Sequence, residues 1–298
     1  MEEILKFDTV AQYNAFNKNE TLHPLVSVVD LSKAAPRQLR RMCYGFYTVF
    51  LKEIKCGDLR YGCSTYDYEE GTLVFLAPGQ AIGSTGEEYY QPQGQALVFH
   101  ADLIHGTSLA RHMSDYTFFS YAVNEALHLS DRERQITQDC FSKIKFELEH
   151  AVDKHSKRLI VTNIELFLNY CVRFYDRQFI TRDHVHKGVL ERFEALLDNF
   201  FLSEKPQTDG LPSVAYCASE LNLSANYFGD LIKKETGKSA HEFIQLKLIT
   251  VAKERMFDAS KSVSEVAYAL GFKYPQHFTR VFKQYVGMTP LEYRSSLN

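Results

Sequence analysis

The last ninety residues contain an internal repeat, and this repeat constrains the fold more than any other feature of the sequence. Residues 218–243 and 267–293 share small, apolar and Gly positions, first at an offset of 49 residues and then, after one extra residue, at 50. Each copy predicts a short helix, a tight turn, a second helix and a Gly that ends it in the left-handed conformation. The matched pairs are Ala218 with Ala267, Leu221 with Leu270, Leu223 with Phe272, Phe228 with Phe278, Lys233 with Lys283, Gly237 with Gly287 and Phe243 with Tyr293.

Both copies also carry the start signals of helices. In the first copy, Pro212 suits a first helical turn and Ser224 suits the cap of the second helix. In the second copy, Ser262 and Glu265 form a capping box, and Pro275 fixes the start of the next helix. These signals, at matched spacing, predict two helix-turn-helix units.

A single helix is expected to join the two units. Ser239 and Glu242 cap it, and it runs to about Phe257. At 1.5 Å per residue its length is about 25 Å. Small residues at Ala218 and Ala267 let the helices of each unit cross closely.

The second helix of the second copy, 275–286, has one apolar face and one polar face. Phe278, Val281, Phe282 and Tyr285 follow the i, i+3, i+4, i+7 pattern of a buried stripe. Arg can bond both guanine acceptors in the major groove, Gln can do the same with adenine, and Lys favours phosphate. The polar face, with the residues just before it, comprises Lys273, Tyr274, Gln276, His277, Arg280 and Lys283.

The segment "SVSEVAYALGFKYPQHFTRVFKQYVGMTPLEYR" closely resembles the C-terminal DNA-binding domain of AraC/XylS-type transcription regulators. The resemblance covers about 211–297, and the first copy, "SANYFGDLIKKETGKSAHEFIQ", also fits it. It implies two recognition helices placed in successive major grooves of double-stranded DNA. The residues that carry it are Ala267, Leu270, Gly271, Phe272, Phe278, Phe282, Lys283, Gly287, Met288, Thr289, Pro290, Tyr293 and Arg294.

The resemblance also implies the positions that contact DNA. Many members carry Arg where this chain has Asp230, and a longer polar residue where it has Gly229. Asp230 could accept from a cytosine amine, repel phosphate or hold a neighbouring Lys, so base reading by the first unit stays open. The predicted set is Asn226, Tyr227, Gly229, Asp230 and Lys233 in the first unit, and Tyr274, Gln276, His277, Arg280 and Lys283 in the second.

The charge distribution agrees with a DNA-binding C-terminal domain. The whole chain has a formal net charge of −3. Residues 205–298 carry 12 Lys and Arg against 9 Asp and Glu, a net +3, so the remainder carries −6. This asymmetry predicts an acidic body joined to a mildly basic domain at 211–298.

Residues 1–125 predict a compact β domain. Short β-type runs occupy 25–30, 44–54, 59–68, 72–78 and 95–100, and Gly-containing turns separate them. The segments "GTLVFLAPGQ" and "GQALVFHADLI" resemble the cupin-like sensor domain of many such regulators. The expected fold class is therefore α+β: an N-terminal cupin-like β-barrel followed by helices, and an all-α C-terminal domain.

Helical periodicity begins near residue 130. Ser130 and Glu133 form a capping box, and the stripe from Ile160 to Tyr175 predicts a strong second helix. We expect 126–202 to be a helical dimerisation or packing segment, with 203–210 as a linker. The stripe can form a dimer contact or pack against the barrel of its own chain, and the sequence leaves both open.

We expect no enzymatic activity, no metal and no cofactor. His100 and His105 lie five apart with Asp102 between them, which does not match a His-x-His metal pair. Glu87 to Tyr90 are interpreted as a solvated loop, and His184 with His186 as a polar turn between helices. The chain shows no C-x-x-C pair, so Cys43, Cys56, Cys63, Cys140, Cys171 and Cys217 are interpreted as reduced thiols of a cytoplasmic protein.

The sequence thus favours a transcription regulator whose N-terminal domain binds a small effector, forms a homodimer, or both. The family resemblance implies contact with RNA polymerase. Two alternatives remain: a cupin-type metalloenzyme targeted to DNA, and a helical repeat that binds protein. No apolar run has the ~18–20 residues of a membrane helix, so no membrane partner is expected. The effector, the target genes and the sign of regulation are not encoded in any motif.

Overall fold

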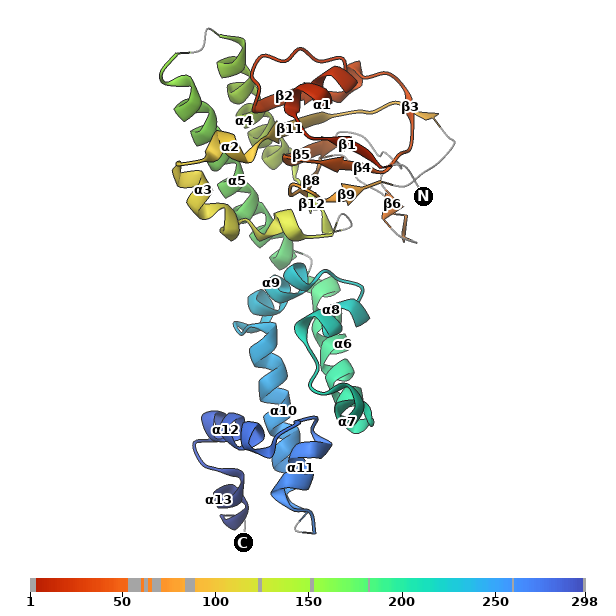
Figure 1. Cartoon of the computed structure of the whole chain (residues 1–298), viewed down its shortest axis with the longest axis vertical. Coiled ribbons are helices and arrows are strands. Elements are labelled where there is room, and N and C mark those ends of the chain that lie inside the picture. The colour runs from red at the N-terminus through yellow and green to blue at the C-terminus, as the bar shows by residue number, and fades with distance from the viewer. Residues whose placement is uncertain are drawn as a thin grey trace. The chain divides into compact units, whose positions relative to one another are not determined.

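The computed structural model divides the chain into two compact units, Met1–Thr181 and Arg182–Asn298 (Figure 1). Each unit has its own hydrophobic core and is described by itself. The structure describes residues 4–52, 60–61, 64–65, 71–83, 89–122, 125–150, 153–181, 183–258 and 260–296.

A five-stranded antiparallel sheet forms the centre of the N-terminal unit. Its strand order is β12–β8–β5–β11–β2. The three inner strands are buried on both faces, which explains why their sequences are almost continuously apolar. The strands are β2 (Val26–Asp30), β5 (Tyr47–Lys52), β8 (Thr72–Leu76), β11 (Gln95–Phe99) and β12 (Leu127–His128).

A smaller sheet and a helix cover one face of this central sheet. The three-stranded sheet has the order β1–β4–β9, with β1 (Leu5–Phe7) parallel to β4 (Met42–Tyr44) and β9 (Ala81–Ile82) antiparallel to it. Helix α1 (Val10–Phe16) begins with a capping box at Thr9. Aromatic and aliphatic side chains of these elements form one buried cluster with inward residues of β5, β8 and β11.

Two short ribbons complete the described strands. They are β3 (Arg37–Gln38) with β10 (Tyr89–Tyr90), and β6 (Arg60–Tyr61) with β7 (Ser64–Thr65). The expected α+β class is confirmed, and β2, β5, β8 and β11 occupy runs predicted from the sequence. Within the described residues, however, every sheet is open, so the closed cupin-like barrel is not confirmed.

Two long antiparallel helices pack beside the strands (Figure 1). Helix α4 (Asp131–Glu149) has the predicted capping box, and α5 (Ser156–Thr181) carries the predicted stripe. Ile164, Phe167 and Leu168 are fully buried, and Tyr175 stacks on Phe118 at 5.5 Å. The stripe therefore packs within its own chain. Shorter helices before it are α2 (Ala101–Ile104), α3 (Ser108–His112), η1 (Leu31–Lys33), η2 (Met113–Asp115) and η3 (Thr117–Ser120).

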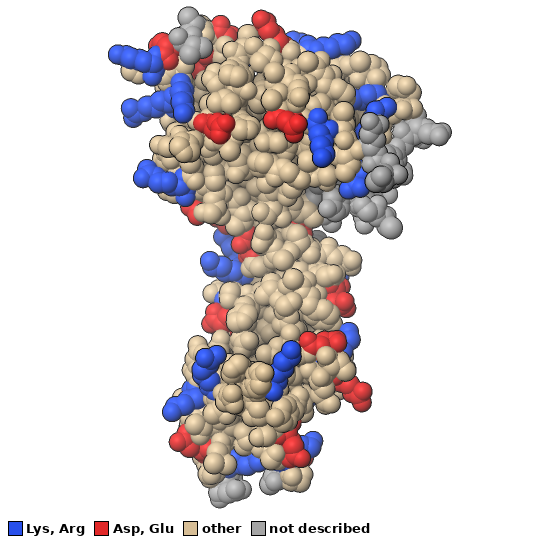
Figure 2. Space-filling model, in the orientation of Figure 1, with Lys and Arg blue, Asp and Glu red and all other residues tan. Residues whose placement is uncertain are grey.

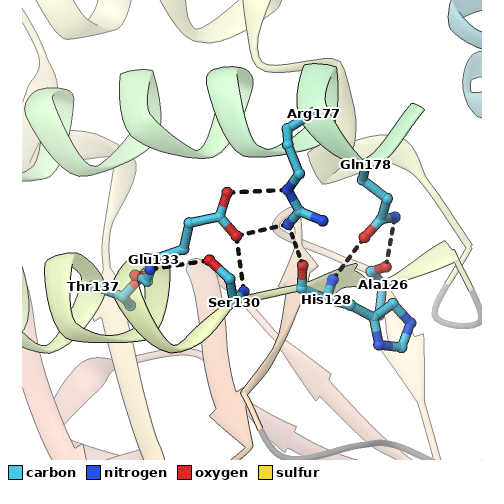
Figure 3. Close-up of polar contacts among 7 residues, drawn as sticks. All are labelled: Ala126, His128, Ser130, Glu133, Thr137, Arg177 and Gln178. Carbon is cyan, nitrogen blue, oxygen red and sulfur yellow. Dashed lines mark hydrogen bonds and ion pairs between the residues drawn. The ribbon is translucent and has the colours of Figure 1, made fainter. Parts of the chain in front are cut away.

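Glu133 links the start of α4 to the end of α5 (Figure 3). Its carboxylate accepts from the backbone N–H of Ser130 at 2.8 Å and from Nε and Nη2 of Arg177 at 3.1 and 2.7 Å. The same Nη2 donates to the carbonyl of His128 at 2.6 Å. A capping carboxylate thus also holds the facing helix through a charge-assisted pair.

The neighbouring Gln178 fixes α5 to the edge strand β12 (Figure 3). Its Oε1 accepts from the N–H of His128 at 2.8 Å, and its Nε2 donates to the carbonyl of Ala126 at 3.2 Å. The amide therefore satisfies backbone groups that a further strand would otherwise bond. This arrangement anchors α5 a few residues before the boundary between the units.

The C-terminal unit is all-helical, and it includes a helix that the sequence analysis assigned elsewhere. Helix α6 (Asp183–Leu202) was expected in the segment 126–202, but it packs with the C-terminal helices. The expected linker 203–210 contains α7 (Lys205–Asp209). The remaining helices are α8 (Val214–Glu220), α9 (Ala225–Thr236), α10 (Ala240–Met256), α11 (Val263–Ala269), α12 (Pro275–Val286) and α13 (Pro290–Ser295).

Candidate nucleic-acid interface

The two predicted helix-turn-helix units are present as α8–α9 and α11–α12. In each unit a buried small residue, Ala218 or Ala267, lies where the two helices cross. The backbone closes both turns in the same way, with Leu223 N–H bonded to Ala218 at 2.9 Å and Phe272 N–H bonded to Ala267 at 3.0 Å. The sequence repeat therefore corresponds to a repeat of backbone structure.

The recognition helices end alike. Gly237 closes α9 at φ 72° and Gly287 closes α12 at φ 85°. Each Gly donates its N–H, at 2.9 Å, to a lysine carbonyl, that of Lys233 or Lys283. A left-handed residue at this position satisfies a carbonyl that the helix end would leave free.

Helix α12 presents the predicted polar residues on its outer face. Phe278 and Phe282 are fully buried in the core of the unit. Gln276, His277 and Arg280 are exposed, as is Lys283 one turn further along. The helix is therefore packed on one side and solvated on the side that carries hydrogen-bonding groups.

The N-terminus of α12 has no side-chain cap. Tyr274 is the N-cap residue, its side chain is 55% exposed, and it makes no side-chain capping bond. In α9, by contrast, Ser224 Oγ accepts from the N–H of Tyr227 at 3.3 Å. Pro275 has no N–H, and the His277 N–H donates to the Tyr274 carbonyl at 3.0 Å, so the Gln276 N–H and the helix dipole are what favour phosphate at the start of α12.

Helix α9 differs from the prediction at one position. Asn226 and Lys233 are exposed, while Gly229 and Asp230 are half-buried. Tyr227 is only 6% exposed and lies among the core residues of the unit, so its ring faces inward. The i, i+3, i+4 pattern does not decide whether Tyr227 or a neighbouring residue occupies the edge of the buried stripe of α9. In the structure the large ring of Tyr227 occupies it.

Helix α10 joins the two helix-turn-helix units and lies beside α6 (Figure 1). It has 17 residues, hence a length of about 26 Å. Lys247 pairs with Asp198 of α6 at 2.5 Å, and the Arg255 guanidinium donates to the carbonyls of Phe201 in α6 and Ala269 in α11. These contacts fix the connecting helix against α6.

Helix α6 contacts both helix-turn-helix units. The ring centroid of Phe193 lies 4.9 Å from that of Phe228 in the first helix-turn-helix unit and 5.2 Å from that of Phe243 in α10. Phe200 and Phe201 belong to the core of the second helix-turn-helix unit. The apolar stripe of α6 was visible in the sequence, but a stripe does not specify which partner it buries against.

The charge of the C-terminal unit is mixed rather than strongly basic. On the face seen in Figure 2, Lys and Arg lie among Asp and Glu side chains. This agrees with the small positive net charge of the segment 205–298. The segment therefore does not present a large basic field.

The candidate metal and thiol groups make ordinary contacts where they are described. His100 caps α2 by accepting from the N–H of Asp102 at 3.2 Å, and Cys140, Cys171 and Cys217 are buried while Cys43 is half-buried. Within the described residues, no three His, Cys, Asp or Glu side chains gather as a metal site, and no helix is long and apolar enough to cross a bilayer. Cys56, Cys63, Glu87, Glu88 and the side chains of His184 and His186 lie outside the described residues.

Residues 217–296 match the family of the helix-turn-helix domain. The chain is 24% identical over 174 residues to LumQ of Photobacterium leiognathi, a probable transcriptional regulator, covering 57% of this chain and 63% of that protein. It is 34% identical over 246 residues to YtdP of Bacillus subtilis, an uncharacterised helix-turn-helix transcriptional regulator, covering 72% of this chain and 32% of that protein. The chain thus spans less than two thirds of the length of these curated relatives.

Similar solved structures include a transcriptional regulator of Chromobacterium violaceum with an AraC-type DNA-binding domain. It is 19% identical, with a TM-score of 0.31, and the match covers 37% of this chain and 91% of that one. ToxT of Vibrio cholerae is 14% identical, with a TM-score of 0.29, over 91% of this chain and 98% of that one. Family assignment therefore depends on the sequence matches.

The C-terminal unit is a double helix-turn-helix DNA-binding domain. It belongs to the AraC type, and the relatives named above are described as transcriptional regulators rather than enzymes.

Proposed function

We propose that the chain is a sequence-specific DNA-binding transcription regulator that uses α9 and α12 as its two recognition helices. The observation that carries this proposal is the outer face of α12. Gln276, His277 and Arg280 are exposed at the N-terminal end of a helix whose opposite face is core. An α-helix supported from behind, with such groups in front, fits the major groove.

Each polar residue of α12 has a distinct proposed role. Arg280 is suited to guanine O6 and N7, and Gln276 to adenine N6 and N7. Lys283 is suited to phosphate, as is the positive end of the helix dipole beside Tyr274. Phosphate contacts set the register of the protein, and the two base contacts set the sequence choice.

The first unit is proposed to contribute mainly to position. Asn226 and Lys233 are exposed on α9 and can contact DNA, whereas Tyr227 is buried. The connecting helix of about 26 Å, with helix widths added, agrees with the ~34 Å separation of successive major grooves. The two recognition helices would therefore lie one turn apart on a single duplex.

The N-terminal unit is proposed to sense a small effector, to form a homodimer, or both. The apolar stripe of α5 is buried within its own chain, so a dimer would use other surfaces. A regulator of this type acts in the cytoplasm, where host DNA and RNA polymerase are accessible, and contact with polymerase is part of the proposal.

Selection of DNA from the host genome tests this function. Purified full-length chain is mixed with fragmented genomic DNA and excess non-specific competitor, and the bound fragments are sequenced. We expect a common site shared by the enriched fragments, and with the Arg280→Ala variant a weaker enrichment of that site with the preference relaxed at one base position. Enrichment that is identical for both proteins, or absent for both, would exclude sequence reading by α12.

A further inference from the structure

Two helices of the C-terminal unit end at one side chain of the connecting helix α10. Phe201 lies in the last turn of α6, and Ala269 is the last residue of α11. The guanidinium of Arg255, the second-last residue of α10, donates to both of their carbonyls, through Nη2 to Phe201 and through Nη1 to Ala269 at 2.8 Å. The last carbonyls of a helix have no partner within the helix, so Arg255 satisfies one carbonyl at each of two helix ends.

The charge and shape of Arg255 suit this position. The C-terminal end of a helix carries a partial negative charge, and a cation placed there stabilises it. Burial lowers the pKa of Arg255, and no carboxylate among the described residues raises it. The helix ends are therefore the negative groups that face this guanidinium. Its planar fork also presents donors in fixed directions, so it holds two acceptors in one geometry.

Helix α6 connects Arg255 to the first helix-turn-helix unit. The ring of Phe193, about two turns before the end of α6, packs edge-on against Phe228 of α9, with centroids 4.9 Å apart. One helix thus contacts the first recognition helix along its length and Arg255 in its last turn. The position of Arg255 is therefore defined relative to α9.

Helix α11 connects Arg255 to the second recognition helix. Helices α11 and α12 are joined by a short turn, closed by the bond from the Phe272 N–H to the Ala267 carbonyl at 3.0 Å. Ala267 is fully buried, and so is Phe278 in the first turns of α12. Because the turn is short and the crossing is tight, a change at the end of α11 displaces the exposed face of α12.

The apolar core around these contacts specifies direction less strictly. Leu248, Ala252 and Met256 of α10 share one buried cluster with Val266 and Ala267 of α11. Burial of apolar surface is favourable but not directional, whereas a charge-assisted hydrogen bond fixes both distance and angle. The core therefore holds α10 and α11 together, and the two bonds of Arg255 define how α11 is oriented.

We propose that Arg255 is a positioning residue for DNA recognition, which fixes the spacing and direction of α12 relative to α9 by holding the ends of α6 and α11 together. It acts through α11 rather than by contact with DNA. This inference rests on the proposed function, in which α9 and α12 read one duplex. It adds a residue outside both recognition helices that sets the distance between the two parts of the DNA site.

The test measures how strictly the protein requires this distance. Fluorescence anisotropy gives the affinity of the full-length chain for the DNA site selected from the genome, and for copies with one base pair inserted or removed between its two parts. The wild type should bind both altered copies at least about tenfold more weakly, because one recognition helix then faces mismatched base pairs. The ratio of the two affinities is the spacing penalty.

Arg255→Lys is the key variant. It keeps the positive charge, so the salt slope of DNA binding should not change, but an ammonium lacks the planar fork that holds two carbonyls. A less preorganised protein binds the correct spacing more weakly and tolerates the wrong spacing better. We expect the spacing penalty to fall about threefold or more. Arg255→Met removes the charge as well and should lower the penalty further.

Lys247→Met is the matched control. Lys247 also lies on α10 and pairs with Asp198 of α6 at 2.5 Å, but this pair joins α10 to α6 alone. The control variant should therefore keep the spacing penalty of the wild type. Circular dichroism at the temperature of the binding assay identifies the variants that are folded, and the Arg255→Lys result stands if Arg255→Met is not.

A spacing penalty in the folded Arg255 variants equal to that of the wild type would overturn the inference. So would an equal loss of affinity for all three DNAs, which is the result expected if Arg255 only stabilises the fold, or the same reduced penalty in Lys247→Met. Failure of the proposed function gives a different result. The wild type would then select no DNA site, whereas failure of this inference alone leaves a wild-type site whose strict spacing the Arg255 variants share.

Discussion

The turn of the first helix-turn-helix unit contains Asn222 at φ 59°, whereas the turn of the second contains Gly271 at φ 94°. Both residues adopt the left-handed conformation, and both turns close with the same backbone hydrogen bond to an Ala. Their surroundings differ. A β-carbon at Gly271 would lie 2.6 Å from the carbonyl oxygen of Pro206 in α7. The same backbone conformation therefore occurs in both turns. The second turn also contacts Pro206, and the sequence repeat does not predict this contact.

The outer faces of the recognition helices differ as well. Helix α12 exposes Gln276, His277 and Arg280, while the matching part of α9 offers Asn226, Gly229 and Asp230. The repeat conserves the positions that pack, and the exposed positions are free to diverge. This difference teaches that a shared fold in the two halves does not imply equal reading of DNA.

Exchanging the turn residues should give the largest effect. Gly271→Asn places a side chain against Pro206 and Gly210, so we expect it to destabilise the protein by about 2–4 kcal/mol. The reciprocal Asn222→Gly meets no such barrier and should change stability by less than about 1 kcal/mol. Urea unfolding followed by circular dichroism measures both. Equal losses in the two variants would mean that the turns are equivalent after all.

Removal of two basic side chains from α12 should separate base reading from phosphate binding. Arg280→Ala should cost about 1–3 kcal/mol on the cognate site and relax the preference at one base position. Lys283→Ala should weaken binding to all sequences similarly and reduce the salt slope by about 0.9. Fluorescence anisotropy across a salt series checks this. Small and uniform effects of both changes would contradict groove reading by α12.

An added basic side chain at Gly229 should strengthen the contact of the first helix-turn-helix unit with DNA. A β-carbon at this position would meet no atom within 4 Å, so Gly229→Arg is sterically allowed. Arg in place of a helical Gly should stabilise the unit by up to about 1 kcal/mol and increase the salt slope of DNA binding by about 0.9. Lower affinity in this variant would indicate that α9 lies away from the duplex.

Acid should lower the stability of the second half of the C-terminal unit, which contains α11 and α13, more than that of the first half. Hydrogen bonds from the backbone N–H groups of Ser262 and Thr289 lower the pKa of Glu265 and Glu292 below the usual value near 4.5. A lowered folded-state pKa contributes stability above the unfolded pKa, and this contribution is lost as the pH falls through the folded pKa. Amide exchange at decreasing pH below about 4.5 should show α11 and α13 losing protection first. The Glu265→Gln and Glu292→Gln variants should lack this dependence.

Much of the C-terminal unit could be predicted because its signals are local. Capping boxes at Ser262, terminal Gly residues and the spacing of Phe278 and Phe282 each specify a backbone conformation or a buried face. The partner of α6 could not be predicted, because an amphipathic stripe fixes which side is buried but not against what. The family resemblance places Tyr227 among the positions that contact DNA, and the structure shows its side chain buried.

The N-terminal unit was less predictable. The apolar runs of β5, β8 and β11 indicated buried strands, and these strands are present. Closure into a barrel depends on pairing between residues far apart in sequence, which no local pattern encodes. The core-facing position of Lys52 was equally hidden, because a single Lys at the end of a strand is normally exposed.

A base-by-base scan of the selected DNA site tests the central claim most directly. Affinity of the full-length chain is measured for every single-base-pair substitution, at fixed salt, with the wild type and with Arg280→Ala. We predict two sensitive blocks centred about one helical turn apart, with larger costs in one block, and in the variant a loss of sensitivity at one base pair of that block alone. A single block, or a variant profile unchanged in shape, would contradict the reading of DNA by two unequal recognition helices.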